Sequence, residues 1–431
     1  MIEKIKMPKQ AGWLIPGLQV KRWFALTLMG TILMTVGILI WFDIKPVYYT
    51  MQFISDIATK ISTEWLAFAF IMFGAAFFFK GWQKTNLSIL DIDDDKDNDV
   101  LLENLYRRRK LNRGPRIVAV GGGTGLSMLL SGIKNITNNI TAVVTVGDDG
   151  GSSGRLRESL GILPPGDIRH CITALADDED LVTKLFKYRF KTGEGLEGHS
   201  FGNLFLTAMC AITGNMVSAI KASSNVISIR GRVLPSTLDD MKLVAEMEDG
   251  RIVHGESTIP EAGGKIKRLF SNPENCRALP EVIEAIKQAE LIILGPGSLY
   301  TSVIPNLLIK EISDEIAKSK AKKIYVCNIM SQPGETDGYT VSDHLKALIQ
   351  HSGHKIVEAV LVNDNIPENL ADKYQKSGSY PVNTDLNEIK KLGIKVCAKN
   401  LIESNKDGLV RHSSRKVARA VYYWFRKERN K

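Results

Sequence analysis

The stretch Ile117-Val118-Ala119-Val120-Gly121-Gly122-Gly123-Thr124-Gly125-Leu126 decides the fold of this 431-residue chain. Its first four residues are an apolar, mostly β-branched run that is typical of a buried parallel strand. Four glycines in five residues follow, and apolar residues then recur at helical spacing through position 133. Glycines let the backbone pass close to a phosphate, and a helix N-terminus offers free N–H groups. Strand, glycine turn and helix in this order predict a phosphate-binding site in a Rossmann-like α/β domain.

This turn matches neither of two common phosphate motifs. Leu126 stands where a dinucleotide fingerprint has its third Gly or Ala. The Gly-Lys-Ser/Thr of a P-loop does not follow. A tight turn without a ligand is the alternative, although such a turn seldom needs four glycines. The candidate ligand contacts are Gly121, Gly122, Gly123, Thr124 and Gly125.

A polar turn follows the next predicted strand, Ile140–Val146. In a doubly wound sheet the carboxyl ends of neighbouring strands border one crevice, so we expect Asp148 and Asp149 to face the same ligand. Their carboxylates suit a ribose hydroxyl or a Mg²⁺ ion bridging phosphates, and an acidic surface turn is the alternative. Further candidate contacts follow along the chain: Gly151, Ser152, Ser153, Arg155 and Arg169.

The helix expected to begin near Ile168 carries three other polar residues around its start. Asp167 is expected to cap it. Arg169 in the first turn opposes the helix dipole, which an anion nearby would explain. His170 is interpreted as a structural histidine in preference to a catalytic base.

A second strand, glycine turn and helix occur in the later part of the chain. Leu291–Leu294 reads as a buried strand, and the residues after it predict another phosphate cradle or, alternatively, a helix cap. The candidates there are Gly295, Gly297, Ser298 and Thr301. The predicted strand Lys323–Cys327 leads to amides and acceptors suited to a base edge or sugar hydroxyls, namely Gln332, Glu335 and Thr336.

Four more candidates have both a ligand-binding and a structural interpretation. His199 precedes an apolar helix, and Asn203 either caps that helix or contacts the ligand. Tyr374 stacks on a base or packs on a surface helix. Arg411 pairs with a phosphate or belongs to a solvated end of the chain.

Asp-Gly at positions 249–250 predicts a hairpin turn inside a small antiparallel insertion over the cleft.

The first 82 residues are predicted to be a membrane hairpin with spans at about 23–42 and 65–82. A cleaved signal peptide and a buried soluble hairpin are the alternatives. Lys and Arg concentrate before the first span and after the second, which places both termini and the main domain in the cytoplasm of a multi-pass protein in the cell membrane. Residues 83–113 are interpreted as an acidic and basic linker, and 114–431 as the ligand-binding domain.

Composition narrows the classes of function. The five cysteines are scattered without a Cys-x-x-Cys pair, so neither a disulfide framework nor a resident metal cluster is predicted. A net charge of +9 without a recognisable DNA- or RNA-binding motif does not predict a nucleic-acid partner. No Ser-His-Asp set is recognisable, so no catalytic residue is assigned.

Several long motifs in order resemble the gluconeogenesis-factor (YvcK) family of the CofD-like superfamily, from roughly Pro115 to the C-terminus. They are the two turns at 121–126 and 147–156, Leu163-Pro164-Pro165-Gly166-Asp167-Ile168-Arg169, Gly198-His199, Gly202-Asn203-Leu204, 294–302, Met330, and Gln332-Pro333-Gly334-Glu335-Thr336. His170 stands where the family is expected to have Asn, and the membrane hairpin is outside the shared domain. The resemblance implies a Rossmann-like fold that binds a nucleotide sugar or a dinucleotide such as NAD. UDP-N-acetylglucosamine is the ligand that it favours most. The resemblance also implies a role in carbon-source-dependent growth, cell shape and envelope synthesis.

Three functions are therefore weighed. The first is a membrane-anchored nucleotide-sugar-binding regulator with an unidentified regulatory or cell-envelope protein as partner, and a possible homo-oligomer. The second is a CofD-like transferase that uses Mg²⁺ on Asp148 and Asp149. The related transferases continue their Asp-Asp tip differently, where this chain has Gly-Gly-Ser-Ser-Gly-Arg. The third, an NAD-dependent dehydrogenase, is disfavoured by Leu126 and by the early position of the aspartates.

Overall fold

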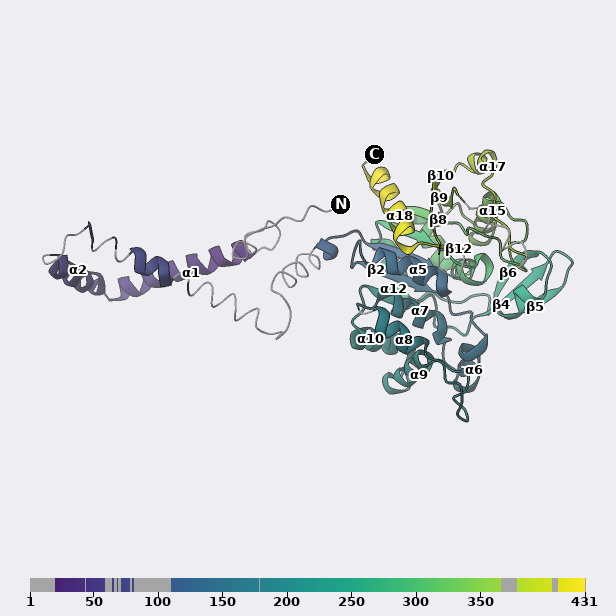
Figure 1. Cartoon of the computed structure of the whole chain (residues 1–431), viewed down its shortest axis with the longest axis horizontal. Helices are drawn as coiled ribbons and strands as arrows, with labels where there is room; N and C mark the ends of the chain where they lie inside the picture. The colour runs from purple at the N-terminus through teal and green to yellow at the C-terminus, as the bar shows by residue number, and fades with distance from the viewer. Residues whose placement is uncertain are drawn as a thin grey trace. The chain divides into compact units, whose positions relative to one another are not determined.

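The computed structural model describes residues 20–42, 44–58, 64–65, 68, 71–77, 80, 110–177, 179–365, 378–404 and 410–430. The chain divides into two compact units, Met1–Lys110 and Leu111–Lys431 (Figure 1). Each unit is described separately below.

In the first unit the described residues include the helices α1 (Val20–Trp41) and α2 (Lys45–Ala58), and residues 71–77 are also helical. The helix α2 lies in the segment between the two predicted spans, which the hairpin prediction treats only as their connection. Among the described residues no single helix has both the length and the apolar character to cross a membrane. Residues Leu28–Trp41 and Lys45–Asp56 meet both requirements only together, with a 93° bend between them. Most of the predicted second span, 65–82, lies outside the described residues.

The second unit is built on a seven-stranded sheet in which every neighbouring pair is parallel. The strands are β1 (Ile117–Gly121), β2 (Ile140–Val144), β3 (Arg232–Pro235), β7 (Leu291–Leu294), β8 (Lys322–Val326), β9 (Ala359–Asn363) and β10 (Lys395–Lys399). Their spatial order is β10-β9-β8-β7-β1-β2-β3. From β1 the chain adds β2 and β3 on one side, and from β7 it adds β8, β9 and β10 on the other side. The strand order therefore reverses between the neighbours β1 and β7. This is the Rossmann-like, doubly wound arrangement that the sequence predicts, and ligands of such sheets bind at the reversal.

Helices cover both faces of this sheet (Figure 1). One apolar core joins it to α5 (Gly123–Ile133), α7 (Pro165–Leu175), α9 (Phe201–Thr213), α10 (Met216–Ile227) and α18 (Ser414–Arg429). The other core contains residues of α12 (Pro280–Gln288), a π-helical turn (Leu299–Val303), α13 (Ile304–Leu308), α14 (Lys310–Lys318), α15 (Val341–Ser352) and α17 (Leu386–Lys391). The remaining elements are α6 (Gly151–Leu160), α8 (Glu179–Lys187), β11 (Ile402–Ser404) and β12 (Val410–His412).

The alternation of side chains along each strand explains why the sheet is buried on both faces. Alternate residues of a strand point to opposite faces, and Ile117 and Ala119 of β1 join one core while Val118 and Val120 join the other. All residues of β1 and β7 are buried, as expected for the central strands of a parallel sheet. Leu126, the departure from the dinucleotide fingerprint, is fully buried in the first core.

The predicted insertion is a three-stranded antiparallel sheet of β4 (Lys242–Met247), β5 (Ile252–His254) and β6 (Ile266–Asn272). The expected hairpin turn connects β4 to β5 through Gly250, whose φ is 86°. A short helix, α11 (Thr258–Glu261), follows β5. The loop between β5 and α11 brings Glu256 to the site described next.

Candidate functional site

The first glycine turn connects β1 to α5. Gly123 has a φ of 58°, in the left-handed region that favours glycine. At Gly122, a side-chain Cβ would lie 2.5 Å from Asp167 Oδ2 and 2.6 Å from Thr145 Cγ2, so no larger residue fits. The N-cap residue of α5 is Gly122, which has no side chain to cap the helix. Instead, the carboxylate of Asp167 accepts a hydrogen bond from the backbone N–H of Gly123.

The second glycine turn follows β7 and packs directly against the first. A Cβ on Gly125 would lie 2.5 Å from the carbonyl oxygen of Pro296 and 2.7 Å from Cα of Gly297. Because both obstacles are backbone atoms, only glycine lets the two turns meet at this distance. The turns lie on β1 and β7, the strands between which the sheet order reverses. Gly295 and Gly297 both have positive φ, 71° and 154°.

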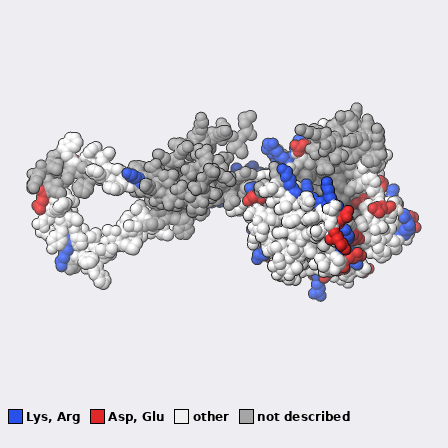
Figure 2. Space-filling model, turned by 60° about the horizontal axis from the view of Figure 1, so that its bottom comes forward, with Lys and Arg blue, Asp and Glu red and all other residues white. Residues whose placement is uncertain are grey.

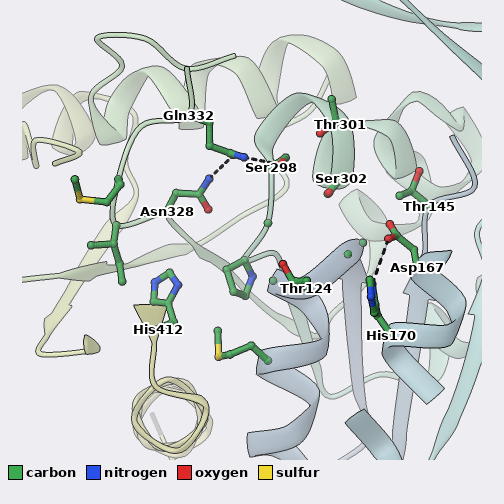
Figure 3. A pocket seen from close by; sticks show the side chains of 18 of the residues that line it. Thr124, Thr145, Asp167, His170, Ser298, Thr301, Ser302, Asn328, Gln332 and His412 are labelled. Carbon is green, nitrogen blue, oxygen red and sulfur yellow. Dashed lines mark hydrogen bonds and ion pairs between the residues drawn. The ribbon is translucent and has the colours of Figure 1, made fainter. Parts of the chain in front are cut away.

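Amide side chains extend the second turn toward β8. Gln332 Nε2 donates a hydrogen bond of 2.7 Å to Ser298 Oγ, and Asn328 Nδ2 donates one of 3.1 Å to Gln332 Oε1. Figure 3 shows this chain of polar groups along one wall of a cavity. The three side chains hold one another in fixed orientations, which prepares their remaining polar atoms for a ligand.

The cavity has a volume of about 770 Å³ and lies over the carboxyl ends of β1, β2, β7 and β8 (Figure 3). Nine predicted site residues line it: Gly122, Gly123, Thr124, Gly125, Asp148, Gly297, Ser298, Thr301 and Gln332. The other lining residues are Met128, Thr145, Asp167, His170, Glu256, Pro296, Ser302, Asn328, Ile329, Met330, Ser331, Ser379 and His412. The volume falls within the range of pockets that hold small ligands.

Three carboxyl groups form an acidic wall of this cavity, namely Asp148, Asp167 and Glu256. Burial, together with the charge of Asp148, raises the pKa of Asp167 to about 7, against the lowering effects of the hydrogen bond from Gly123 and of the charge of Arg169. Burial, with the charges of Asp148 and Asp167, raises the pKa of Glu256 to about 8. The pKa of Asp148 is also raised by burial, against hydrogen bonds from Gly150 and Ser153 that lower it. The wall therefore gains negative charge as the pH rises through neutrality.

Two histidines stand on opposite sides of the cavity (Figure 3). Burial, aided by Arg169, lowers the pKa of His170 to about 3, so its 3.9 Å contact with Asp167 is no ion pair at neutral pH. Burial lowers the pKa of His412 to about 4. His170 Nδ1 and His412 Nε2 are buried and have no hydrogen-bond partner among the described residues. Both rings thus present neutral, unpaired nitrogens at the cavity.

Other predicted residues support the site from outside the cavity. Asp149 does not line it, because its carboxylate accepts hydrogen bonds from Glu256 N, Ser257 N and Ser257 Oγ. It therefore fixes the loop that carries Glu256. Gly121 ends β1, and its carbonyl oxygen accepts hydrogen bonds from Thr145 N and Asn306 Nδ2.

A buried polar cluster between α6 and α9 contains several more predicted contacts. Ser152 Oγ lies 2.9 Å from His199 Nδ1 and accepts a 3.0 Å hydrogen bond from Asn203 Nδ2. Asn203 is not the cap of α9, since Ser200 has that position. Gly151 and the buried Ser153 lie in the first turn of α6.

Two of the three arginines predicted to bind a phosphate, Arg155 and Arg169, also form hydrogen bonds within the protein. Arg155 donates to the carbonyl oxygen of Glu197, and Arg169 donates to that of Phe186 and lies beside the His170 ring. The helix α7 begins at Pro165, so Asp167 sits in its first turn and is not its cap, contrary to our expectation. These residues shape the wall behind the cavity.

Glu335 and Thr336 brace the second turn. Glu335 accepts hydrogen bonds from Tyr300 N and Thr301 Oγ1, and Thr336 Oγ1 accepts one from Gln332 N. Gly295 follows β7 and is not a lining residue. Arg411 lies in β12, next to His412. Tyr374 lies outside the described residues.

The sequence interpretation did not include several lining residues among the site residues. Asp167 and His170 were seen but were assigned structural roles. Glu256 is at the end of the predicted insertion, and His412 follows Arg411, so neither had a local motif to mark it. Thr145 precedes the Asp148 turn and faces the Gly122 backbone.

The acidic wall is also the place to test for a divalent cation. Carboxylate oxygens suit Mg²⁺, which commonly takes one or two carboxylates together with ligand phosphates. Among the described residues, no group of three His, Cys, Asp or Glu side chains is arranged to hold a metal ion. A cation at Asp148 and Asp167 would therefore depend on oxygens from the ligand.

Comparison with known proteins identifies the group to which this domain belongs. Residues 117–402 match the family described as "2-phospho-L-lactate transferase CofD". A gluconeogenesis factor from Bacillus subtilis is 51% identical over 309 residues, which cover 72% of this chain and 97% of that protein. A relative from Nostoc is 47% identical over 419 residues, covering 96% of this chain and 92% of its own length. Relatives thus exist both with and without a region that matches the N-terminal part.

A crystal structure of a Bacillus halodurans protein has the same fold. Its TM-score is 0.70 at 48% identity, and the match covers 72% of this chain and 100% of that one. This coverage corresponds to the length of the second unit, which therefore has a stand-alone counterpart. With the family match over 117–402, the chain belongs to the CofD family and is a homologue of the gluconeogenesis factors.

Proposed function

We propose that the cavity binds a nucleotide sugar, with UDP-N-acetylglucosamine as the first candidate, and that the protein is a membrane-anchored regulator of the gluconeogenesis-factor type. The observation that carries the proposal is the meeting of two glycine turns at the strand reversal, at the contact between Gly125 and Gly297. Backbone N–H groups at two such turns suit a diphosphate. The regulator would act in carbon-source-dependent growth, cell shape and envelope synthesis.

The amide wall supports the nucleotide part of this ligand. Asn328, Gln332 and Ser298 provide donors and acceptors that suit a uracil edge or sugar hydroxyls. Met128, Ile329 and Met330 add apolar surface beside them. A polar diphosphate end and a mixed amide and apolar end are what a nucleotide sugar requires of a single cavity.

The acidic wall favours a second candidate, a CofD-like transferase acting on a diphosphate-containing substrate. Asp148 and Asp167 would hold Mg²⁺ together with the substrate phosphates, and the cation would supply charge stabilisation for a leaving phosphate. Asp149, which we expected to share this role, instead fixes the Glu256 loop. The chain's own residues would orient the substrate through Ser298 and Gln332.

Ligand-induced stabilisation separates these candidates. We expect UDP-N-acetylglucosamine at 100 times its dissociation constant to stabilise the second unit by about 2.7 kcal/mol, unlike NAD or GTP at equal concentration. A shift that needs Mg²⁺, together with conversion of the sugar nucleotide detected by chromatography, would favour the transferase. No shift with any uridine nucleotide would overturn the proposed ligand.

Membrane anchoring is tested independently of the ligand. The helices α1 and α2 expose large apolar side chains, among them Leu33, Met34, Ile40 and Phe53, to no partner in the described structure. We expect the full chain to sediment with membranes and to resist extraction by carbonate, and the unit from Leu111 to stay soluble. A full chain found in the soluble fraction would contradict the anchor.

A further inference from the structure

The C-terminal helix α18 divides cleanly into an apolar and a basic face. Its inner face is buried in the core through Val417, Ala418, Val421, Trp424 and Phe425. Its outer face is exposed and holds six cations and no acid, namely Arg415, Lys416, Arg419, Arg426, Lys427 and Arg429. The single acid of the helix, Glu428, is buried and pairs with Lys395 at 2.5 Å.

Four of these cations are unused within the domain. Arg415, Arg419, Arg426 and Lys427 have no hydrogen bond or ion pair to any residue in the part of the chain that the structure describes. Tyr423 lies among them on the same face and is 67% exposed. An exposed tyrosine within a basic helical face suits the interface between water and lipid, where its ring meets the headgroups.

The basic face ends beside the point at which the chain enters the domain. Arg429 Nη1 lies 3.5 Å from Glu290 Oε1, and Glu290 Oε2 accepts a hydrogen bond from Arg116 N, just before β1. The end of α18 is therefore at the amino-terminal edge of the sheet, opposite the cavity at the carboxyl edge. Lys110 and Arg113, both exposed, stand at the same entry. Figure 2 shows a row of Lys and Arg side chains beside a band of Asp and Glu side chains on one face of the domain, with further basic and acidic side chains scattered around both.

We propose that the outer face of α18, the α18 basic face, docks on the anionic headgroups of a lipid bilayer. The charge is complementary, the unpaired cations share one face, and the segment leading to the domain connects it to the apolar helices of the first unit. This docking goes beyond the proposed nucleotide-sugar binding and does not depend on it.

The test uses the unit from Leu111 to Lys431, because a stand-alone relative with this fold has been crystallised. It is mixed with vesicles of phosphatidylcholine alone or with about 30% phosphatidylserine, and binding is measured by flotation. We expect binding only to the anionic vesicles, and loss of most of it on raising salt from about 0.05 M to about 0.5 M. The variant Arg415→Gln/Arg419→Gln/Arg426→Gln should bind at least about tenfold more weakly.

A matched control removes the same charge elsewhere. Lys287→Gln/Lys310→Gln/Lys318→Gln changes three exposed lysines on α12 and α14, helices of the other core. This variant should bind anionic vesicles within about twofold of the parent. Equal losses in both variants would show a net-charge effect and overturn the proposal, as would no binding to the anionic vesicles. Binding of a labelled RNA in place of vesicles, with the same sensitivity to the α18 variant, would instead assign the face to nucleic acid.

Discussion

Replacement of Asp167 by Asn should stabilise the domain at pH 8 and leave its stability at pH 4 almost unchanged. The pKa of this carboxyl is raised from 3.8 to about 7 by burial and by Asp148. A folded-state pKa above the unfolded value means that the folded chain binds the extra proton between about pH 4 and pH 7. Stability therefore falls as the pH rises through this window, and the loss is complete above it.

The size of this loss follows from the shift. About 3 pKa units at 1.36 kcal/mol each give about 4 kcal/mol at pH 8. Asn has the same shape and keeps an oxygen that accepts from Gly123 N–H, so the variant removes the charge and little else. We expect Asp167→Asn to recover up to about 4 kcal/mol at pH 8, a rise in Tm of several degrees. Part of the slope should remain, because the pKa of Glu256 is raised to about 8.

Thermal and urea unfolding of the unit from Leu111, measured from pH 4 to pH 8.5, supply the comparison. Glu158→Gln, an exposed change on α6, is the matched control and should keep the parent's pH profile. If Asp167→Asn is no more stable than the parent at pH 8, and both lose stability equally with rising pH, Asp167 does not carry the buried charge that we assign to it.

Four further predictions concern the same cavity. Gly125→Ala should destabilise the domain by about 1–3 kcal/mol and abolish the thermal shift with UDP-N-acetylglucosamine, because its methyl group meets the backbone of Pro296 and Gly297; an unchanged shift would contradict the role of the paired turns. Gln332→Ala should weaken ligand binding by about 1 kcal/mol in calorimetry with little change in Tm, since it frees Ser298 and Asn328. Asp149→Ala should lower the urea midpoint by the equivalent of about 1–3 kcal/mol, because it leaves Glu256 N and Ser257 N unpaired; a neutral effect would show that the Glu256 loop holds itself. Affinity for the anionic ligand should be several-fold higher at pH 6 than at pH 8, since the raised pKa values of Asp167 and Glu256 leave the wall less charged at pH 6; equal affinities would place the phosphates away from this wall.

The fold was predictable because its central strands carry strong local signals. The β-branched run 117–120 and the apolar run 291–294 are each followed by glycines, and both lie at the strand reversal as expected. In contrast, β3 was not anticipated, because Arg232–Pro235 is short, ends in proline and borders the sheet on one side only. The helix α2 was also not predicted, because the segment between the two predicted spans was interpreted only as their connection.

The candidate site was predictable only where its residues follow a strand. The glycine turns and the amides after β8 could be predicted because each directly follows a predicted strand, and they line the cavity. Asp148 and Asp149 are adjacent in sequence, yet successive side chains point in different directions, and only Asp148 faces the cavity. Glu256 and His412 reach it from the insertion and from β12, and contacts of such long sequence separation leave no local pattern.

The central claim is most directly tested by a crystal structure of the unit from Leu111 soaked or grown with UDP-N-acetylglucosamine. We expect the diphosphate at the two glycine turns, within hydrogen-bonding distance of the backbone N–H groups near Gly125 and Ser298. We also expect the uridine against Asn328 and Gln332. A ligand bound elsewhere on the domain, with the cavity left to solvent, would contradict the claim.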